Sequence, residues 1–169
     1  MNWPYPRVVA HRGGGALAPE NTLGAIRRGA SLGFKGVEFD VMLAGDGTPV
    51  VIHDETVDRT TNGRGEVPKM TYLELSKLKI EKDERIPTFE QAGRLCRELG
   101  VWANVEIKPA QGHERATGEA AADWLGFSFC ELSSAASSSP SPGSASSSSA
   151  VSFNSPFSFS MSWQTQLSA

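Results

Sequence analysis

Polar side chains interrupt two otherwise apolar segments of this sequence, and their types could bind a cation. Glu38 and Asp40 alternate with apolar residues in GVEFDVML, and Glu106 and Lys108 do the same in VWANVEIK. Residues two apart in a strand share a face and lie about 6.6 Å apart along the chain. Each segment is therefore predicted to be a strand with carboxylates on one face and apolar side chains on the other.

Carboxylates on an apolar strand are costly to bury unless a cation or an ion pair compensates for their charge. For Glu38 and Asp40 alone, an ordinary structural ion pair is the better explanation. The addition of Glu106 on a second strand favours a metal site. Because the ligands would be oxygens, without clustered Cys or His, the site suits a hard divalent ion, Mg²⁺ or Ca²⁺, better than zinc.

Two histidines, His11 and His53, each follow a short apolar run and each precede a charged residue. In a parallel α/β fold, the downstream ends of strands form the edge where ligands bind. A single histidine there is more often structural, but two beside three carboxylates indicate an acid/base pair. Arg12 and Lys108 supply positive charge that could hold phosphate oxygens.

This combination is suited to the hydrolysis of a phosphate ester. A metal and two cations can neutralise the phosphoryl oxygens, while one imidazole deprotonates the attacking oxygen and the other protonates the leaving alcohol. The residues do not indicate which histidine has which role.

The elements around these residues alternate between strands and helices. The apolar patterns predict strands over residues 7–10, 36–43, 49–53 and 101–108, and helices that follow Thr22, a short one over 71–78, one over 88–99 and one over 114–125. Residues 54–67 are polar and rich in turn-forming types, which predicts a long surface loop. The alternation favours an α/β fold with a mostly parallel sheet.

The 169-residue chain has a formal net charge of −3 and two cysteines. There is no basic excess for nucleic-acid binding, no disulfide framework, no apolar run long enough to span a membrane, and only a poor signal peptide at the start. We therefore expect a cytoplasmic protein without a membrane span.

From position 131 to the end, Glu131 is the only charged residue and serine dominates. This break predicts a globular domain over residues 1–125 and a Ser-rich, disordered tail over residues 126–169.

Four strings along the first part of the chain, VVAHRGGGALAPENTLGAI, VEFDVMLAGDGTPVVIHD, DRTTNG and NVEIKP, resemble the glycerophosphodiester phosphodiesterase family, its bacterial cytoplasmic type in particular. The resemblance implies hydrolysis of glycerophosphodiesters to an alcohol and glycerol 3-phosphate. It also implies roles for the residues found above. These are metal binding by Glu38, Asp40 and Glu106, acid/base catalysis by His11 and His53, and phosphate contacts by Arg12 and Lys108.

The family fold is a (β/α)₈ barrel, which typically takes about 250 residues. The strands counted here make roughly the first half of such a barrel, so the resemblance implies a C-terminally truncated member with an aberrant tail. We expect such a chain to be weakly active or inactive, because a half-barrel leaves open sheet edges. Two other readings are a lysophospholipase-D-type phosphodiesterase and a non-catalytic fragment. The expected partner is the small-molecule substrate, with no obligate protein partner.

Overall fold

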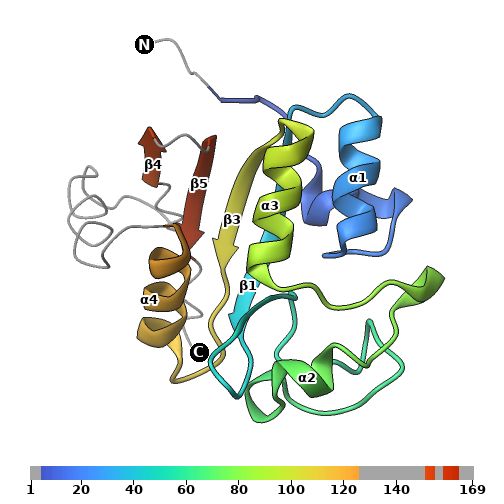
Figure 1. Cartoon of the computed structure of the whole chain (residues 1–169), viewed down its shortest axis with the longest axis vertical. Coiled ribbons are helices and arrows are strands. Elements are labelled where there is room, and N and C mark those ends of the chain that lie inside the picture. Colours follow the sequence, from blue (N-terminus) through green and yellow to red (C-terminus); the bar gives the residue numbers. More distant parts are fainter. Residues whose placement is uncertain (1–4, 126–150, 155–157, 164–169) are drawn as a thin grey trace, which may run out of the picture.

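The computed structural model describes residues 5–125, 151–154 and 158–163. Over these residues, strands and helices alternate along the chain, and short 3₁₀ turns connect some of them (Figure 1). The elements are η1 (His11–Gly13), η2 (Gly15–Leu17), α1 (Leu23–Ser31), β1 (Gly36–Leu43), β2 (Pro49–Val51), η3 (Val67–Lys69), α2 (Tyr72–Leu75), η4 (Glu81–Asp83), α3 (Phe89–Leu99), β3 (Trp102–Ile107), α4 (Glu114–Leu125), β4 (Val151–Asn154) and β5 (Ser158–Trp163).

Three helices, α1, α2 and α3, begin where the sequence predicts, because threonine side chains cap them. Thr22 Oγ1 accepts a hydrogen bond from the Ala25 N–H at the start of α1. Thr88 forms a capping box with Gln91 at the start of α3, and Gly100 ends this helix in the left-handed region at φ 62°. Thr71 caps α2 in the same way as Thr88 caps α3. Each cap satisfies backbone groups that the first or last turn leaves unpaired.

β1 and β3 are parallel neighbours in a five-stranded sheet whose order is β2-β1-β3-β5-β4. Their register pairs Glu38 with Asn104 and Asp40 with Glu106. The polar side chains predicted to share a face on each strand therefore lie on the same side of the sheet, directly across from one another.

The prediction of a mostly parallel sheet is wrong in its detail. β1 pairs with β2 in antiparallel fashion, and β4 pairs with β5 in the same way, so the sheet is mixed. β1 and β2 are antiparallel because the connection between them is short. The turn at Asp46-Gly47 reverses the chain directly, whereas a parallel crossover needs a dozen or more residues.

One further expectation needs correction. The predicted strand over residues 7–10 is reduced to one parallel bridge between Ala10 and Val37, because Val8 faces outward with 67% of its surface exposed. Within the predicted Ser-rich tail, the structure describes β4 and β5, and β5 pairs in parallel with β3. The remainder of residues 126–169 lies outside the described residues.

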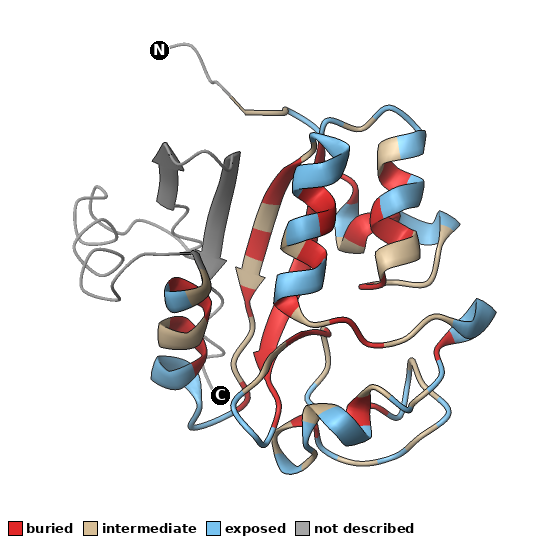
Figure 2. Cartoon of the chain, viewed as in Figure 1, coloured by how far each residue is buried: buried red, intermediate tan, exposed pale blue. Residues whose placement is uncertain are grey.

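Two apolar cores lie around the sheet. In the first, α1, α3 and α4 cover one face, with Phe39 and Phe89 among the fully buried side chains (Figure 2). The second core lies under the segment between β2 and α3, where Val57, Val67 and Leu75 are completely buried. The predicted surface loop over 54–67 is therefore part of a small lobe with its own core. None of the helices in the described ranges is long and apolar enough to cross a membrane.

Candidate active site

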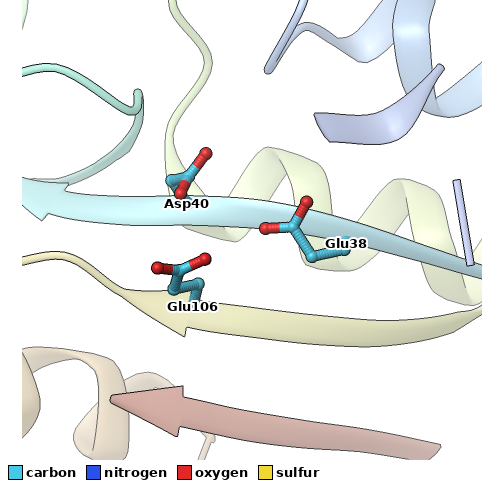
Figure 3. A group of neighbouring side chains, drawn as sticks. All are labelled: Glu38, Asp40 and Glu106. Carbon is cyan, nitrogen blue, oxygen red and sulfur yellow. The ribbon is translucent and has the colours of Figure 1, made fainter. Parts of the chain in front are cut away.

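Three carboxylates converge on the sheet face opposite the helices. Glu38 and Asp40 project from β1 and Glu106 from β3, all toward the same side (Figure 3). One oxygen of each lies within 4.8 Å of the others. Glu38 and Asp40 are buried, while Glu106 is half-buried. The three residues predicted from strand alternation are thus brought together.

Two oxygens of this carboxylate cluster lack a hydrogen-bond donor within the part of the chain that the structure describes. Glu38 Oε1 and Glu106 Oε1 are buried and have no hydrogen-bond partner among the described residues. Burial raises the pKa of Glu38 to about 7, a backbone hydrogen bond from Arg12 opposes this, and the charges of Asp40 and Glu106 reinforce it. Two orphaned carboxylate oxygens in an all-oxygen donor set fit a hard divalent cation.

Asn21 holds Asp40 and was not predicted to do so. Its Nδ2 donates to Asp40 Oδ2 at 2.8 Å, and its Oδ1 accepts from the Asp40 N–H at 3.2 Å. Asn21 is 4% exposed and lies in the left-handed region at φ 57°, which asparagine tolerates better than most residues. The string PEN, which precedes the helix, is the sequence signal that could have indicated this role.

His11 and Arg12 lie in the η1 turn beside this cluster. The Arg12 N–H donates to Glu38 Oε2 at 2.8 Å, and His11 Nε2 lies 3.8 Å from the same oxygen. The Arg12 guanidinium Nε lies 3.8 Å from Asp40 Oδ2, too far for a hydrogen bond, and has no partner among the described residues. The positively charged Arg12 side chain therefore faces the carboxylates with one N–H still available to donate.

Close packing against α1 fixes the position of this turn. A Cβ atom at Gly29 would lie 2.2 Å from the Gly13 carbonyl oxygen, and Gly13 itself has φ +88°. The first two glycines of the Gly13–Gly15 run therefore permit close approach to the helix.

His53 reaches the site through the β1–β2 hairpin, not through the edge of a parallel sheet as predicted. The antiparallel pairing leads β2 back along β1, and the Ile52 N–H donates to the Asp40 carbonyl. His53 Nδ1 lies 2.6 Å from Asp54 Oδ1, and its Nε2 lies 2.7 Å from Lys108 Nζ. Because a carboxylate only accepts and an ammonium only donates, these partners assign the ring proton to Nδ1 and the lone pair to Nε2.

Two more charged residues beside the site, Glu20 and Arg59, had no predicted role. Arg59 donates to both Glu20 and Asp54, and Glu20 also accepts from Arg12. The hydrogen bond from Arg59 is the main cause that lowers the pKa of Asp54 to about 2. Arg59 lies in the DRTTNG string, which was noted only for its family resemblance. A cavity of about 610 Å³ adjoins Glu20 and Arg59 and extends to Lys79 and Glu81.

The chain was compared with known protein families and curated proteins. Residues 11–137 match the model of the glycerophosphoryl diester phosphodiesterase family. The chain is similar to a glycerophosphodiester phosphodiesterase of Caldanaerobacter subterraneus, with 48% identity over 60% of this chain and 44% of that protein. It is also similar to human glycerophosphodiester phosphodiesterase 1, with 40% identity over 69% of this chain and 38% of that protein. The chain thus spans less than half the length of these two relatives.

Solved structures show the same likeness. A phosphodiesterase of Oleispira antarctica, in complex with the product sn-glycerol-3-phosphate, superposes with a TM-score of 0.70 and 40% identity, over 72% of this chain and 52% of that one. A Thermotoga maritima glycerophosphodiester phosphodiesterase superposes with a TM-score of 0.60 and 32% identity, over 72% of this chain and 50% of that one. These neighbours confirm the predicted fold class, an α/β chain of the (β/α)₈ barrel family that covers about half of the barrel. The matched residues include both histidines and all three carboxylates, and the chain belongs to the glycerophosphoryl diester phosphodiesterase family.

Proposed function

We propose that this chain hydrolyses glycerophosphodiesters to an alcohol and glycerol 3-phosphate, using a divalent cation, Mg²⁺ or Ca²⁺, bound by Glu38, Asp40 and Glu106. The observation that carries the proposal is the convergence of three carboxylates within 4.8 Å, two of which have a buried oxygen without a hydrogen-bond partner in the described ranges. Family membership supports the reaction class. A relative bound to sn-glycerol-3-phosphate supports the product.

The cation, when bound, would supply positive charge at the phosphoryl oxygens. Arg12 contributes a second positive charge, because its Nε, which has no hydrogen-bond partner in the described part of the chain, faces the carboxylates from the η1 turn. Lys108, directly after β3, contributes a third positive charge. Its ammonium lies within hydrogen-bond distance of His53 Nε2. When the diester binds, the Lys108 ammonium donates instead to a phosphoryl oxygen, which leaves the lone pair of His53 Nε2 available.

His11 and His53 are the acid/base pair of this proposal. His53 accepts or returns a proton at Nε2, since Asp54 holds the proton on Nδ1. His11 Nε2 lies 3.8 Å from Glu38 Oε2, with 70% of the His11 side chain exposed, and His11 exchanges a proton with the other reacting oxygen of the phosphodiester. One imidazole activates the attacking oxygen and the other protonates the leaving alcohol.

The test is release of glycerol 3-phosphate from glycerophosphocholine by the complete 169-residue chain, with Mg²⁺ and Ca²⁺ titrated separately. We expect weak, metal-dependent turnover that falls to the buffer background in His53→Ala and in Glu38→Gln. Glu90→Gln, a matched change of a carboxylate that pairs with Arg94 on the exposed side of α3, should retain the wild-type rate.

Calorimetric titration of the same variants with each metal separates binding from turnover. Metal binding that is lost in Glu38→Gln but accompanied by no hydrolysis would indicate a non-catalytic, metal-binding fragment and would contradict the proposal. Equal hydrolysis by wild type and His53→Ala would also contradict it.

A further inference from the structure

An unbroken row of hydrogen bonds joins the two loops that carry the histidines, and it passes through Arg59 and Glu20. Arg59 Nε donates to Asp54 Oδ2 at 2.6 Å. Its Nη1 and Nη2 donate to the two oxygens of Glu20 at 2.8 Å each. Glu20 Oε1 also accepts from Arg12 Nη1 at 2.7 Å. The row thus begins at the residue after His11 and ends at His53.

The geometry of this row differs from that of an ordinary surface ion pair. Isolated exposed pairs contribute little to structure, whereas a bidentate guanidinium–carboxylate contact fixes both groups in one plane. Arg59 forms such a bidentate contact with Glu20 and donates a third N–H to Asp54. The side chains of Arg12, Glu20 and Asp54 are only 20–28% exposed. Hydrogen bonds from Arg59 lower the pKa of both carboxyl groups, so both are ionised at neutral pH.

The row has a consequence at each end. At one end, one oxygen of Asp54 accepts from Arg59 and the other contacts His53 Nδ1. This pair of contacts orients the imidazole and keeps its Nε2 directed at Lys108. At the other end, Glu20 holds Nη1 of Arg12, and this leaves the Arg12 Nε facing Asp40. A carboxylate beside a ring nitrogen commonly selects the tautomer in this way.

We propose that Arg59, together with Glu20, is a positioning residue that orients His53 through Asp54 and Arg12 through Glu20. Its effect on catalysis rests on the proposed function, but its effect on the His53 imidazole does not. Neither Arg59 nor Glu20 needs to touch the substrate for this role, because each acts through a side chain that already faces the site.

The test is NMR of the complete, ¹⁵N-labelled chain, with the His53 signals assigned from their loss in His53→Gln. In the wild type we expect a ring proton on Nδ1 of His53, seen as a downfield proton protected from exchange with water. Arg59→Met should lose this protected signal, and Asp54→Asn should lose it too. Arg64→Met is the matched control, because Arg64 lies in the same loop and, among the described residues, forms an ion pair with Asp58 at the surface.

Survival of the protected Nδ1 proton in Arg59→Met would overturn the proposal and make Arg59 a surface residue. If the methionine variant does not fold, Arg59→Lys retains the charge without the three-donor fork and must lose the signal as well. A lysine variant that retains the signal would also overturn the proposal. In a chain that turns over, Arg59→Met should lower kcat about 10–100-fold with KM nearly unchanged, and the NMR result stands even where no turnover is found.

Discussion

Asn21 and Asp40 hold each other through two hydrogen bonds, one from the Asn21 amide to Asp40 Oδ2 and one from the Asp40 N–H to Asn21 Oδ1. Both residues are buried, and they lie 19 positions apart. The amide therefore fixes the rotation of a carboxylate that we propose as a metal ligand. Groups that orient ligands in this way commonly contribute 10–100-fold to metal affinity.

Asn21→Ala is expected to weaken metal binding by about 10–100-fold, because Asp40 loses its orienting partner. The free energy of unfolding should also fall by about 1–3 kcal/mol, since a buried carboxylate oxygen loses its donor. Calorimetric metal titration and urea unfolding measure the two effects. Asn62→Ala, which removes an amide that accepts from Lys79 in the small lobe, should lower stability without changing metal affinity. Equal affinities in Asn21→Ala and wild type would contradict this prediction.

The pKa of Glu38 predicts how the stability of the metal-free protein depends on pH. Burial raises this pKa from 4.5 to about 7, so the folded state retains a proton that the unfolded state has released. The contribution is complete below pH 4.5 and is lost as the pH rises through about 7. The free energy of unfolding in EDTA should therefore fall by up to about 3 kcal/mol across this interval.

Urea unfolding at pH 5 and pH 8 measures this effect, and Glu38→Gln should remove most of the difference between the two values. Added metal should oppose the loss at pH 8, because it stabilises the ionised carboxylates. The prediction fails if wild type and Glu38→Gln show the same pH dependence.

For Asp54, we expect the free energy of unfolding to depend on pH in the opposite direction, and in acid. Its pKa is lowered from 3.8 to about 2, mainly by the hydrogen bond from Arg59 and then by the one from His53. Its stabilising effect is present above pH 3.8 and is lost as the pH falls through about 2. Because the group is partly exposed, we expect a loss of roughly 1 kcal/mol. Acid unfolding of Asp54→Asn should lack this component. Asp58→Asn, on the same loop, should retain it.

Gly29→Ala is expected to destabilise the protein although alanine favours helices. The new Cβ would lie 2.2 Å from the Gly13 carbonyl, so either α1 or the η1 turn has to move. Such overpacking costs about 1–3 kcal/mol, more than the roughly 1 kcal/mol gained in helix propensity. Urea unfolding measures the loss, and Arg27→Ala, at an exposed position of the same helix, should cause little change. A variant as stable as wild type would show that the turn can move freely.

The local features of this protein follow from residue types along the chain. Alternation predicted that Glu38 and Asp40 share a face of β1, and the same pattern predicted the face of Glu106 on β3. Threonine and glycine predicted where α1 and α3 begin and end. These features depend on side-chain periodicity and on backbone groups within a few residues, so the necessary information is adjacent in the sequence.

The partners of these residues depended instead on topology. The antiparallel return of β2 brings His53 to the cluster, although the rule for parallel sheets predicted a different route. Arg59 meets Glu20 across 39 positions, and Asn21, whose backbone has a positive φ, meets Asp40 across 19 positions. A hydrogen bond between distant loops depends on the distance and angle that the whole fold imposes, and no local pattern encodes either quantity.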